Sequence, residues 1–294
     1  MPTYHFETVD VFTTRRFGGN PLAVFPRAEG IDPGDMQRLA AELNLSETTF
    51  VLPPEEPGHS ARVRIFNRSH EMPFAGHPMV GTAFVLARMA NEPPASLSFE
   101  VPAGIVEVRL ESRGGEVSGA VIDAPQPLTL GIELPPAEIA GCVGLDAEEV
   151  LVTHHPPLLA TVGNTYVIAE VTAAGLDRAL PELAAFRKVR DGHPGLAGRF
   201  SLYLYTRREA TFGARMFAPL AGTFEDPATG SAATPLAALL LSLSGGEAAS
   251  FEIHQGVQMG RPSLLEAKAW RTPAGIRASV GGSCVPVFRG EVTF

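Results

Sequence analysis

Apolar residues in this chain occur mostly in short runs, some alternating with polar residues and some unbroken, a pattern typical of β-strands. We expect strands at residues 4–12, 21–25, 50–52, 61–66, 106–111, 151–154, 165–171, 201–206, 213–217 and 276–294. One helix is predicted from Asp32, its cap, and Pro33, its first residue, to about Asn44, and another near 174–187. The pattern is that of an α+β protein.

Two further helices are predicted where small residues form a turn before an apolar segment. Gly76 and Gly230 occupy these turns at an offset of 154 residues. Gly19-Asn20 and Gly163-Asn164 precede apolar runs at the similar offset of 144 residues. The two offsets predict an internal duplication of about 150 residues.

The richest stretch of proline and glycine lies between Pro125 and Pro136, and we expect the domain boundary there. A length of 294 residues also favours two domains. The prediction is an N-terminal domain over 1–128 and a C-terminal domain over 129–294.

Composition and charge narrow the possible partners. The chain has 23 Lys plus Arg against 32 Asp plus Glu, for a net charge of −9, and no basic cluster that would follow a phosphate backbone, so a nucleic-acid partner is not expected. The first residues lack the pattern of a secretory signal, which makes the cytoplasm the expected location. The uncharged run 227–246 contains prolines and glycines and is interpreted as a loop entering a buried helix rather than as a membrane segment.

Several kinds of chemistry find no support in the sequence. Cys142 and Cys284 are far apart, without a CxxC partner, and are interpreted as buried free thiols. The histidines show no HxxxH or HExxH spacing, so no metal site is predicted. Ser231 is not part of a GxSxG nucleophile elbow.

The two glycine turns are candidate anion sites, because a helix N-terminus exposes N–H groups and the positive end of its dipole. Two such sites facing each other would hold a small carboxylate. The alternative is that Gly76 and Gly230 only permit tight turns.

Titratable residues near these turns are candidates for proton transfer. Glu47 interrupts an uncharged stretch at a helix-to-strand junction, where apolar neighbours would make it an acid or base, but a surface glutamate is the alternative. For His77, the alternative to a catalytic role is a role in packing. For Asp226, the alternative is that it caps the N-terminus of the following helix.

Six short motifs, in order, resemble the phenazine-biosynthesis-like (PhzF) family of the diaminopimelate-epimerase-like superfamily. They are Val9-Asp10-Val11-Phe12, Phe17-Gly18-Gly19-Asn20-Pro21-Leu22-Ala23-Val24, Leu45-Ser46-Glu47-Thr48-Thr49-Phe50, Pro73-Phe74-Ala75-Gly76-His77-Pro78, Glu225-Asp226-Pro227-Ala228-Thr229-Gly230-Ser231-Ala232 and Gly260-Arg261-Pro262-Ser263. They span residues 9–263, nearly the whole chain.

The resemblance implies two similar domains, each a barrel-like, mostly antiparallel sheet around a central helix, with the active site in the cleft between them. The helices after Gly76 and Gly230 would be the central helices. The resemblance also implies a homodimer.

The resemblance further implies an isomerase that moves a proton within a small carboxylic acid without a metal or organic cofactor. Glu47 matches the family's general acid and base, and His77 and Asp226 match residues that assist the transfer. The positions that match substrate-binding residues are Asn20, Gly76, Gly230 and Ser231.

Two other functions stay open at this stage. Epimerases of the superfamily use a cysteine at the start of each central helix, and here those positions hold Gly76-His77 and Gly230-Ser231, which disfavours an amino-acid epimerase or dehydratase. A non-catalytic protein that binds small molecules is the other alternative, although it has less need of Glu47, His77 and Asp226 together.

Overall fold

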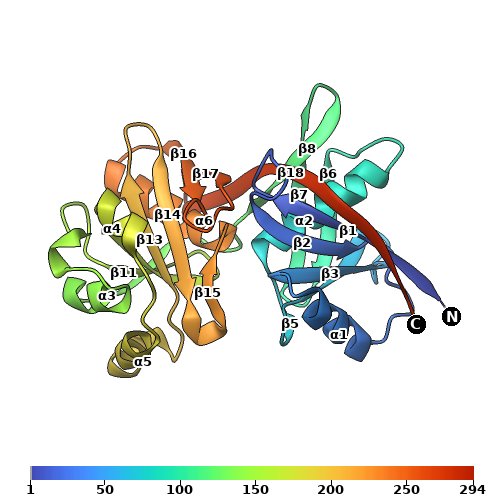
Figure 1. Ribbon diagram of the computed structural model, residues 1–294. Coiled ribbons are helices and arrows are strands. Elements are labelled where there is room, and N and C mark those ends of the chain that lie inside the picture. The colour runs from blue at the N-terminus through green and yellow to red at the C-terminus, as the bar shows by residue number, and fades with distance from the viewer. Residues whose placement is uncertain (1) are drawn as a thin grey trace. The chain divides into compact units, whose positions relative to one another are not determined.

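The computed structural model describes residues 2–294, which divide into two compact units (Figure 1). Unit 1 contains the described residues up to Asp123 together with Gly281–Phe294, and unit 2 is Ala124–Val280. The division falls a few residues before the expected boundary after residue 128. The C-terminal segment, which the sequence assigned to the second domain, belongs to unit 1 because it pairs there as a strand.

The part of unit 1 that the structure describes, from residue 2 onwards, contains ten elements and the last part of an eleventh. In chain order they are β1 (Thr3–Val11), β2 (Asn20–Phe25), α1 (Pro33–Leu43), β3 (Glu47–Leu52), β4 (Ala61–Phe66), β5 (Glu71–Met72), α2 (Gly76–Met89), β6 (Ser96–Val101), β7 (Gly104–Arg113), β8 (Glu116–Asp123) and β18 (Gly275–Thr293).

Within the described residues of unit 1, eight strands close into a barrel. The pairing runs β1, β2, β3, β4, β6, β7, β8 and β18, and β18 returns to β1. β2 with β3 and β4 with β6 are parallel, whereas β1 with β2, β3 with β4, β6 with β7, β7 with β8 and β18 with β1 are antiparallel, so the sheet is mostly antiparallel. Closure removes the two free edges that β1 and β8 would otherwise expose.

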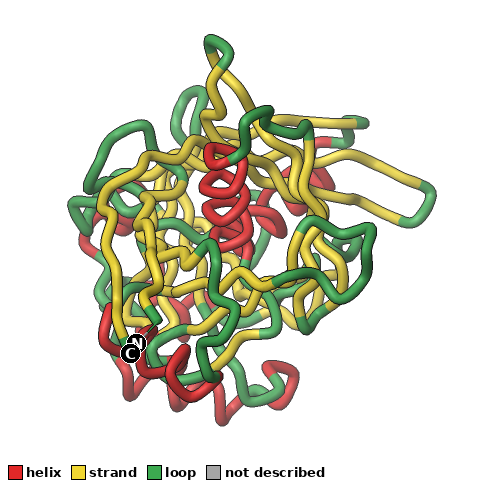
Figure 2. The backbone as a smooth tube through the Cα atoms, turned by 90° about the vertical axis from the view of Figure 1, so that its right-hand side faces the viewer, coloured by secondary structure: helices red, strands yellow, loops and turns green. Residues whose placement is uncertain are grey.

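Helix α2 lies inside this barrel and packs against β1, β2, β3, β7 and β8 (Figure 2). Every residue from Gly76 to Val85 is buried, so the helix has no solvent-exposed face over its first turns. Gly81 allows the close approach: a Cβ there would lie 2.6 Å from Leu22 Cδ2 and 2.8 Å from Val11 Cγ2. The barrel and its helix therefore share one apolar core.

Helix α1 covers the outside of the barrel and matches its sequence prediction. Asp32 caps it by accepting from the Gly34 N–H, Pro33 is its first residue, and Asn44 ends it in the left-handed region. Beneath it, Phe25 and Phe50 stack with ring centroids 4.8 Å apart. The strands of this part of the barrel are thus covered on both faces.

Unit 2 contains the following elements, besides the start of β18. They are β9 (Thr129–Glu133), α3 (Pro136–Cys142), β10 (Val150–Leu151), β11 (Leu158–Thr161), β12 (Thr165–Val171), α4 (Ala173–Arg178), α5 (Leu183–Gly192), β13 (Leu202–Arg207), β14 (Phe212–Ala218), β15 (Thr223–Asp226), α6 (Gly230–Ser244), β16 (Ala248–Gln255) and β17 (Ser263–Thr272), with short 3₁₀ turns at Ala147–Glu149, Pro194–Leu196 and Pro219–Ala221.

Strand pairing in unit 2 repeats that of unit 1, which confirms the predicted duplication. β12 is parallel to β13, β13 is antiparallel to β14, β14 is parallel to β16, and β16 is antiparallel to β17. Unit 1 has the same sequence of relations from β2 to β7. Helix α2 follows the short strand β5, which pairs with β4. Helix α6 follows the short strand β15, which pairs with the corresponding strand β14.

Helix α6 packs against β11, β12, β16 and β17, and almost all of its residues from Gly230 to Leu241 are buried. This confirms that the uncharged run enters a buried helix. Among residues 2–294, no helix has the length and apolar character needed to cross a bilayer.

Two sequence predictions in unit 2 are wrong in detail. The helix expected near 174–187 is two helices, α4 and α5, because the chain leaves the helical path at Ala179 and Pro181 cannot continue it. The strand expected at 151–154 is reduced to Val150–Leu151, since the prolines at 156 and 157 follow it closely.

We expect Gly81→Ala to lower the free energy of unfolding by about 1–3 kcal/mol, because the new methyl group overlaps Leu22 and Val11 inside the barrel. Gly141→Ala is the matched control, since Gly141 also lies in a helix but a Cβ there meets nothing within 4 Å. That variant should be neutral or slightly stabilising because alanine favours helix. Urea unfolding of both variants measures the difference, and equal effects would contradict the packing argument.

Candidate functional site

Glu47 and His77 are brought together at the start of α2. Glu47 is the first residue of β3, and His77 is the second residue of α2. Their Oε2 and Nε2 atoms are 3.1 Å apart, and the side chains are 16% and 7% exposed. Glu47 is therefore largely buried, so the alternative of a surface glutamate is wrong.

The imidazole of His77 is neutral at neutral pH, because burial lowers its pKa to about 3. Its approach to Glu47 is therefore a close polar contact between a carboxyl group and a neutral imidazole, and not an ion pair between two charged groups. One ring nitrogen of a neutral imidazole donates and the other accepts. Burial thus keeps an uncharged imidazole ring beside the Glu47 carboxyl group.

Asn20 belongs to the same end of unit 1. It is fully buried at the start of β2, where it pairs with Val11. The preceding Gly19 has φ +60°, and a Cβ there would lie 2.3 Å from the Val11 carbonyl oxygen, so this turn requires glycine. Two residues further along β2, Leu22 pairs in parallel with Glu47. The turn thereby sets Asn20 beside the strand that carries Glu47.

The first turn of α2 has no side-chain cap. Its N-cap residue is Ala75, which has no polar side chain, and Gly76 is the first helical residue. The N–H groups of a first helical turn have no partner within the helix. The backbone N–H groups of Gly76 and His77 therefore have no partner inside the helix, and the His77 side chain contacts Glu47.

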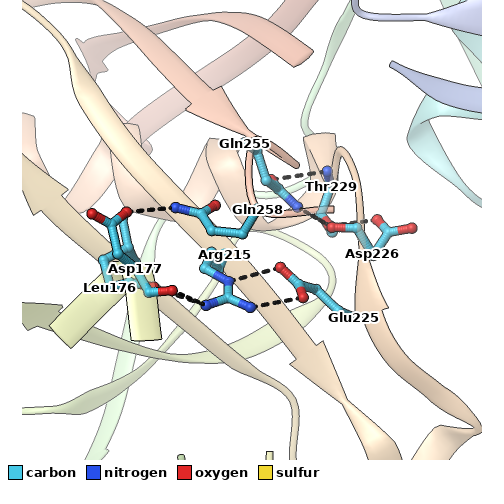
Figure 3. A network of polar contacts seen from close by, with 8 residues as sticks. All are labelled: Leu176, Asp177, Arg215, Glu225, Asp226, Thr229, Gln255 and Gln258. Carbon is cyan, nitrogen blue, oxygen red and sulfur yellow. Dashed lines mark hydrogen bonds and ion pairs between the residues drawn. The ribbon is translucent and has the colours of Figure 1, made fainter. Parts of the chain in front are cut away.

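In unit 2, Asp226 ends β15, and α6 begins at Gly230. The N-cap of α6 is Thr229. Asp226 is therefore not the N-cap, and that alternative is wrong. Instead, the Thr229 hydroxyl donates to Asp226 Oδ2 at 2.5 Å (Figure 3).

Buried polar side chains hold this turn from several sides (Figure 3). The Gln255 amide bonds to the backbone of Asp226 and to both the backbone and the hydroxyl of Thr229. Next to Asp226, the Glu225 carboxylate receives two hydrogen bonds from Arg215, at 2.8 and 2.9 Å. The turn before α6 is therefore rigidly supported.

Ser231, the second residue of α6, contacts Tyr166 of β12, with the two hydroxyl oxygens 2.6 Å apart. His77 holds the corresponding position in α2. The residue that faces the second helical position from the sheet is therefore a carboxylic acid in unit 1 and a phenol in unit 2.

The predicted site residues thus form one group in each unit. Asn20, Glu47, Gly76 and His77 lie in unit 1, and Asp226, Gly230 and Ser231 lie in unit 2. The sequence analysis missed Tyr166, Thr229 and Gln255. Thr229 lies within a motif, and Gln255 directly precedes a glycine turn, but nothing in the sequence singles out Tyr166.

Neither cysteine lies at these helix starts. Cys142 and Cys284 are free and buried, which confirms their interpretation, and burial raises the pKa of the Cys142 thiol to about 12. Within residues 2–294, no three His, Cys, Asp or Glu side chains are grouped so that they could hold a metal ion.

The sequence of the chain matches one protein family over almost its whole length. The model of this family, described as phenazine biosynthesis-like protein, matches residues 9–290. An uncharacterised isomerase from Mesorhizobium japonicum is 38% identical over 99% of both chains. The trans-2,3-dihydro-3-hydroxyanthranilate isomerase of Pseudomonas chlororaphis is 35% identical over 98% of this chain and 99% of that protein.

Solved structures show the same fold. A Bacillus anthracis phenazine biosynthesis protein of the PhzF family matches with a TM-score of 0.89, at 25% identity and over 100% of both chains. A hydroxyproline epimerase from Agrobacterium vitis matches with a TM-score of 0.62 at 12% identity, over 99% of this chain and 92% of that one. The second likeness concerns the fold alone and supports the α+β, epimerase-like architecture.

Replacing His77 should make stability less sensitive to acid. In the unfolded chain His77 has a pKa near 6.5, whereas in the folded protein its pKa is about 3. As pH falls from 6.5 towards 3, the unfolded state therefore binds a proton that the folded state does not, and the free energy of unfolding decreases. Between pH 7 and pH 5 this contribution amounts to about 2 kcal/mol. Urea unfolding of His77→Gln at both values should show a correspondingly smaller loss than the wild type. An unchanged loss would contradict a neutral, buried His77.

Proposed function

The chain belongs to the phenazine biosynthesis-like protein family, and from this premise we propose that it is an isomerase in which Glu47 moves a proton within a small carboxylic acid. The observation that carries the proposal is the contact between Glu47 and the neutral His77 beside the uncapped start of α2. Relatives named as isomerases over nearly the full chain support the reaction class.

In the proposed reaction the Glu47 carboxylate removes a proton from a carbon atom of the substrate. The electrons left behind shift the double bond towards the substrate carboxylate, and the protonated Glu47 then returns the proton to a different carbon atom. One proton leaves and one returns, so no oxidant or external acid is consumed. The His77 imidazole keeps the Glu47 carboxyl group oriented through both steps.

The substrate carboxylate is proposed to bind N–H groups at the starts of α2 and α6, where the helix dipoles favour an anion. Ala75 cannot cap α2, and the Thr229 hydroxyl is directed to Asp226 rather than to α6. The proposal assigns Asn20, Gly76, Gly230 and Ser231 to binding, and His77 and Asp226 to assisting Glu47.

An epimerase with two thiols is the less favoured alternative. The second residues of α2 and α6 are His77 and Ser231, and neither is a thiol. Burial raises the pKa of both Cys142 and Cys284, so neither becomes a thiolate near neutral pH. Proton movement by one carboxyl group on one face of the substrate is therefore the better-supported chemistry.

Glu47→Gln should reduce turnover by about 100- to 10,000-fold, because glutamine keeps the shape of the side chain but cannot carry the proton. Proton NMR in D₂O follows both isomerisation and exchange of carbon-bound hydrogen. The first compound to test is trans-2,3-dihydro-3-hydroxyanthranilate, which the name of the Pseudomonas relative indicates, followed by other small unsaturated acids.

Glu107→Gln is the matched control, since Glu107 is an exposed strand glutamate of the same unit. It should retain wild-type activity. Full activity in Glu47→Gln would exclude Glu47 as the acid and base. Ligand-induced shifts without any hydrogen exchange in the wild type would favour the alternative of a non-catalytic binding protein.

The homodimer and the cytoplasmic location stay predictions that rest on the resemblance and on the sequence. For the dimer, light scattering on the purified protein should give a mass about twice the 31.1 kDa of one chain. A mass that stays at one chain across the concentration range would exclude a stable dimer.

A further inference from the structure

We propose that Gln255 and Thr229 are positioning residues that make Asp226 bind and release a proton at Oδ1 only. This inference rests on the proposed function, in which Asp226 assists proton transfer. Gln255 is the last residue of β16 and is 0% exposed, and Thr229 and Asp226 are also buried. Figure 3 shows the side chains of these three residues together. None of the motifs that resemble the family contains Gln255.

The orientation of the Gln255 amide is determined by its four hydrogen bonds. Its Nε2 donates to the Asp226 carbonyl oxygen at 2.8 Å and to Thr229 Oγ1 at 3.0 Å. Its Oε1 accepts from the Thr229 N–H and from the Tyr203 hydroxyl, both at 3.1 Å. A flipped amide would set oxygen against the Asp226 carbonyl and nitrogen against the Thr229 N–H, so only one orientation satisfies every group.

Tyr203 reinforces this orientation. Burial raises the pKa of its phenol above the usual range, so the hydroxyl keeps its proton and acts as a donor to Gln255. The amide oxygen therefore has two donors, and the amide nitrogen has two acceptors, which is the full capacity of a buried glutamine side chain at this site.

The Gln255 amide determines the direction in which the Thr229 hydroxyl hydrogen points. Because Oγ1 accepts a hydrogen bond from the Gln255 amide, its own hydrogen points to the remaining neighbour, Asp226 Oδ2, at 2.5 Å. Such a short O–H···O distance is typical of a hydrogen bond to an anion. A proton on Asp226 Oδ2 would face the hydroxyl hydrogen at this distance, so a proton taken up by Asp226 is held on Oδ1.

The contact also stabilises the ionised form of Asp226, because a hydrogen bond donated to a carboxylate favours the charge. Without the Thr229 hydroxyl, Asp226 binds its proton more tightly and exchanges it from either oxygen. The inference thus predicts a change in the pH dependence of catalysis, and a role in holding the turn alone predicts none.

Thr229→Val and Thr229→Ser form the decisive pair, because valine has the shape of threonine without the hydroxyl, and serine keeps the hydroxyl. We expect Thr229→Val to lower kcat/KM by about 10- to 100-fold and to move the acid limb of its pH profile to higher pH. Thr229→Ser should keep the wild-type profile. Gln255→Met, which removes the amide at similar size, should change the profile in the same direction as Thr229→Val.

Ser263→Ala is the control for a purely structural effect. The Ser263 hydroxyl donates to the Pro227 carbonyl at 2.9 Å and so supports the same turn without contacting the Asp226 carboxylate. This variant should lose stability but keep the wild-type pH profile. Equal changes of the profile in Ser263→Ala and Thr229→Val would overturn the inference, as would a wild-type profile in Thr229→Val.

A second readout does not depend on activity. Carbon NMR of protein labelled at the aspartate carboxyl carbons, with the Asp226 signal assigned from its loss in Asp226→Asn, follows the titration of this group directly. The signal should titrate at higher pH in Thr229→Val than in Thr229→Ser, and equal midpoints would refute the inference. Absence of hydrogen exchange in the wild type would instead refute the proposed function, and the NMR comparison would still decide the role of Thr229.

Discussion

Each unit is organised around a helix that exposes almost no polar face, and such a helix is stable in water only when other elements enclose it. In unit 1 the enclosure is a closed barrel, and in unit 2 the same order of strand pairings recurs around α6. The remaining features follow from this burial. Gly81 is needed where the barrel wall approaches α2, and β18 must return to unit 1 because its pairing with β1 closes the wall.

Burial of the helix also determines where chemistry is possible. The side of an enclosed helix is covered by strands, so its first turn is the part that offers backbone donors at an end of the sheet. Glycine at the first helical position and the lack of a side-chain cap leave these donors to another partner. Glu47 starts the strand that reaches the same end, which explains its contact with the second residue of α2.

The duplicated units have diverged at this end in the groups that face each other. In unit 1 the Glu47 carboxyl group contacts the His77 imidazole, which burial keeps neutral. In unit 2 the second residue of α6, Ser231, instead contacts the hydroxyl group of Tyr166 on β12, and the Asp226 carboxylate accepts a hydrogen bond from Thr229. The duplication thus preserves the scaffold and the helix starts, while the side chains at the second helical position and their partners differ.

The sequence by itself determined the elements whose causes are local or periodic. The cap, first proline and end of α1 were predicted from Asp32, Pro33 and Asn44, and the duplication was predicted from the spacing of Gly76 and Gly230. Only the tertiary structure decided which strands pair, that the chain's end completes unit 1, and that Gln255 directs Thr229 towards Asp226. Those outcomes depend on contacts between residues far apart in the chain, and the direction of a buried hydrogen bond depends on every donor and acceptor around it, which no local pattern records.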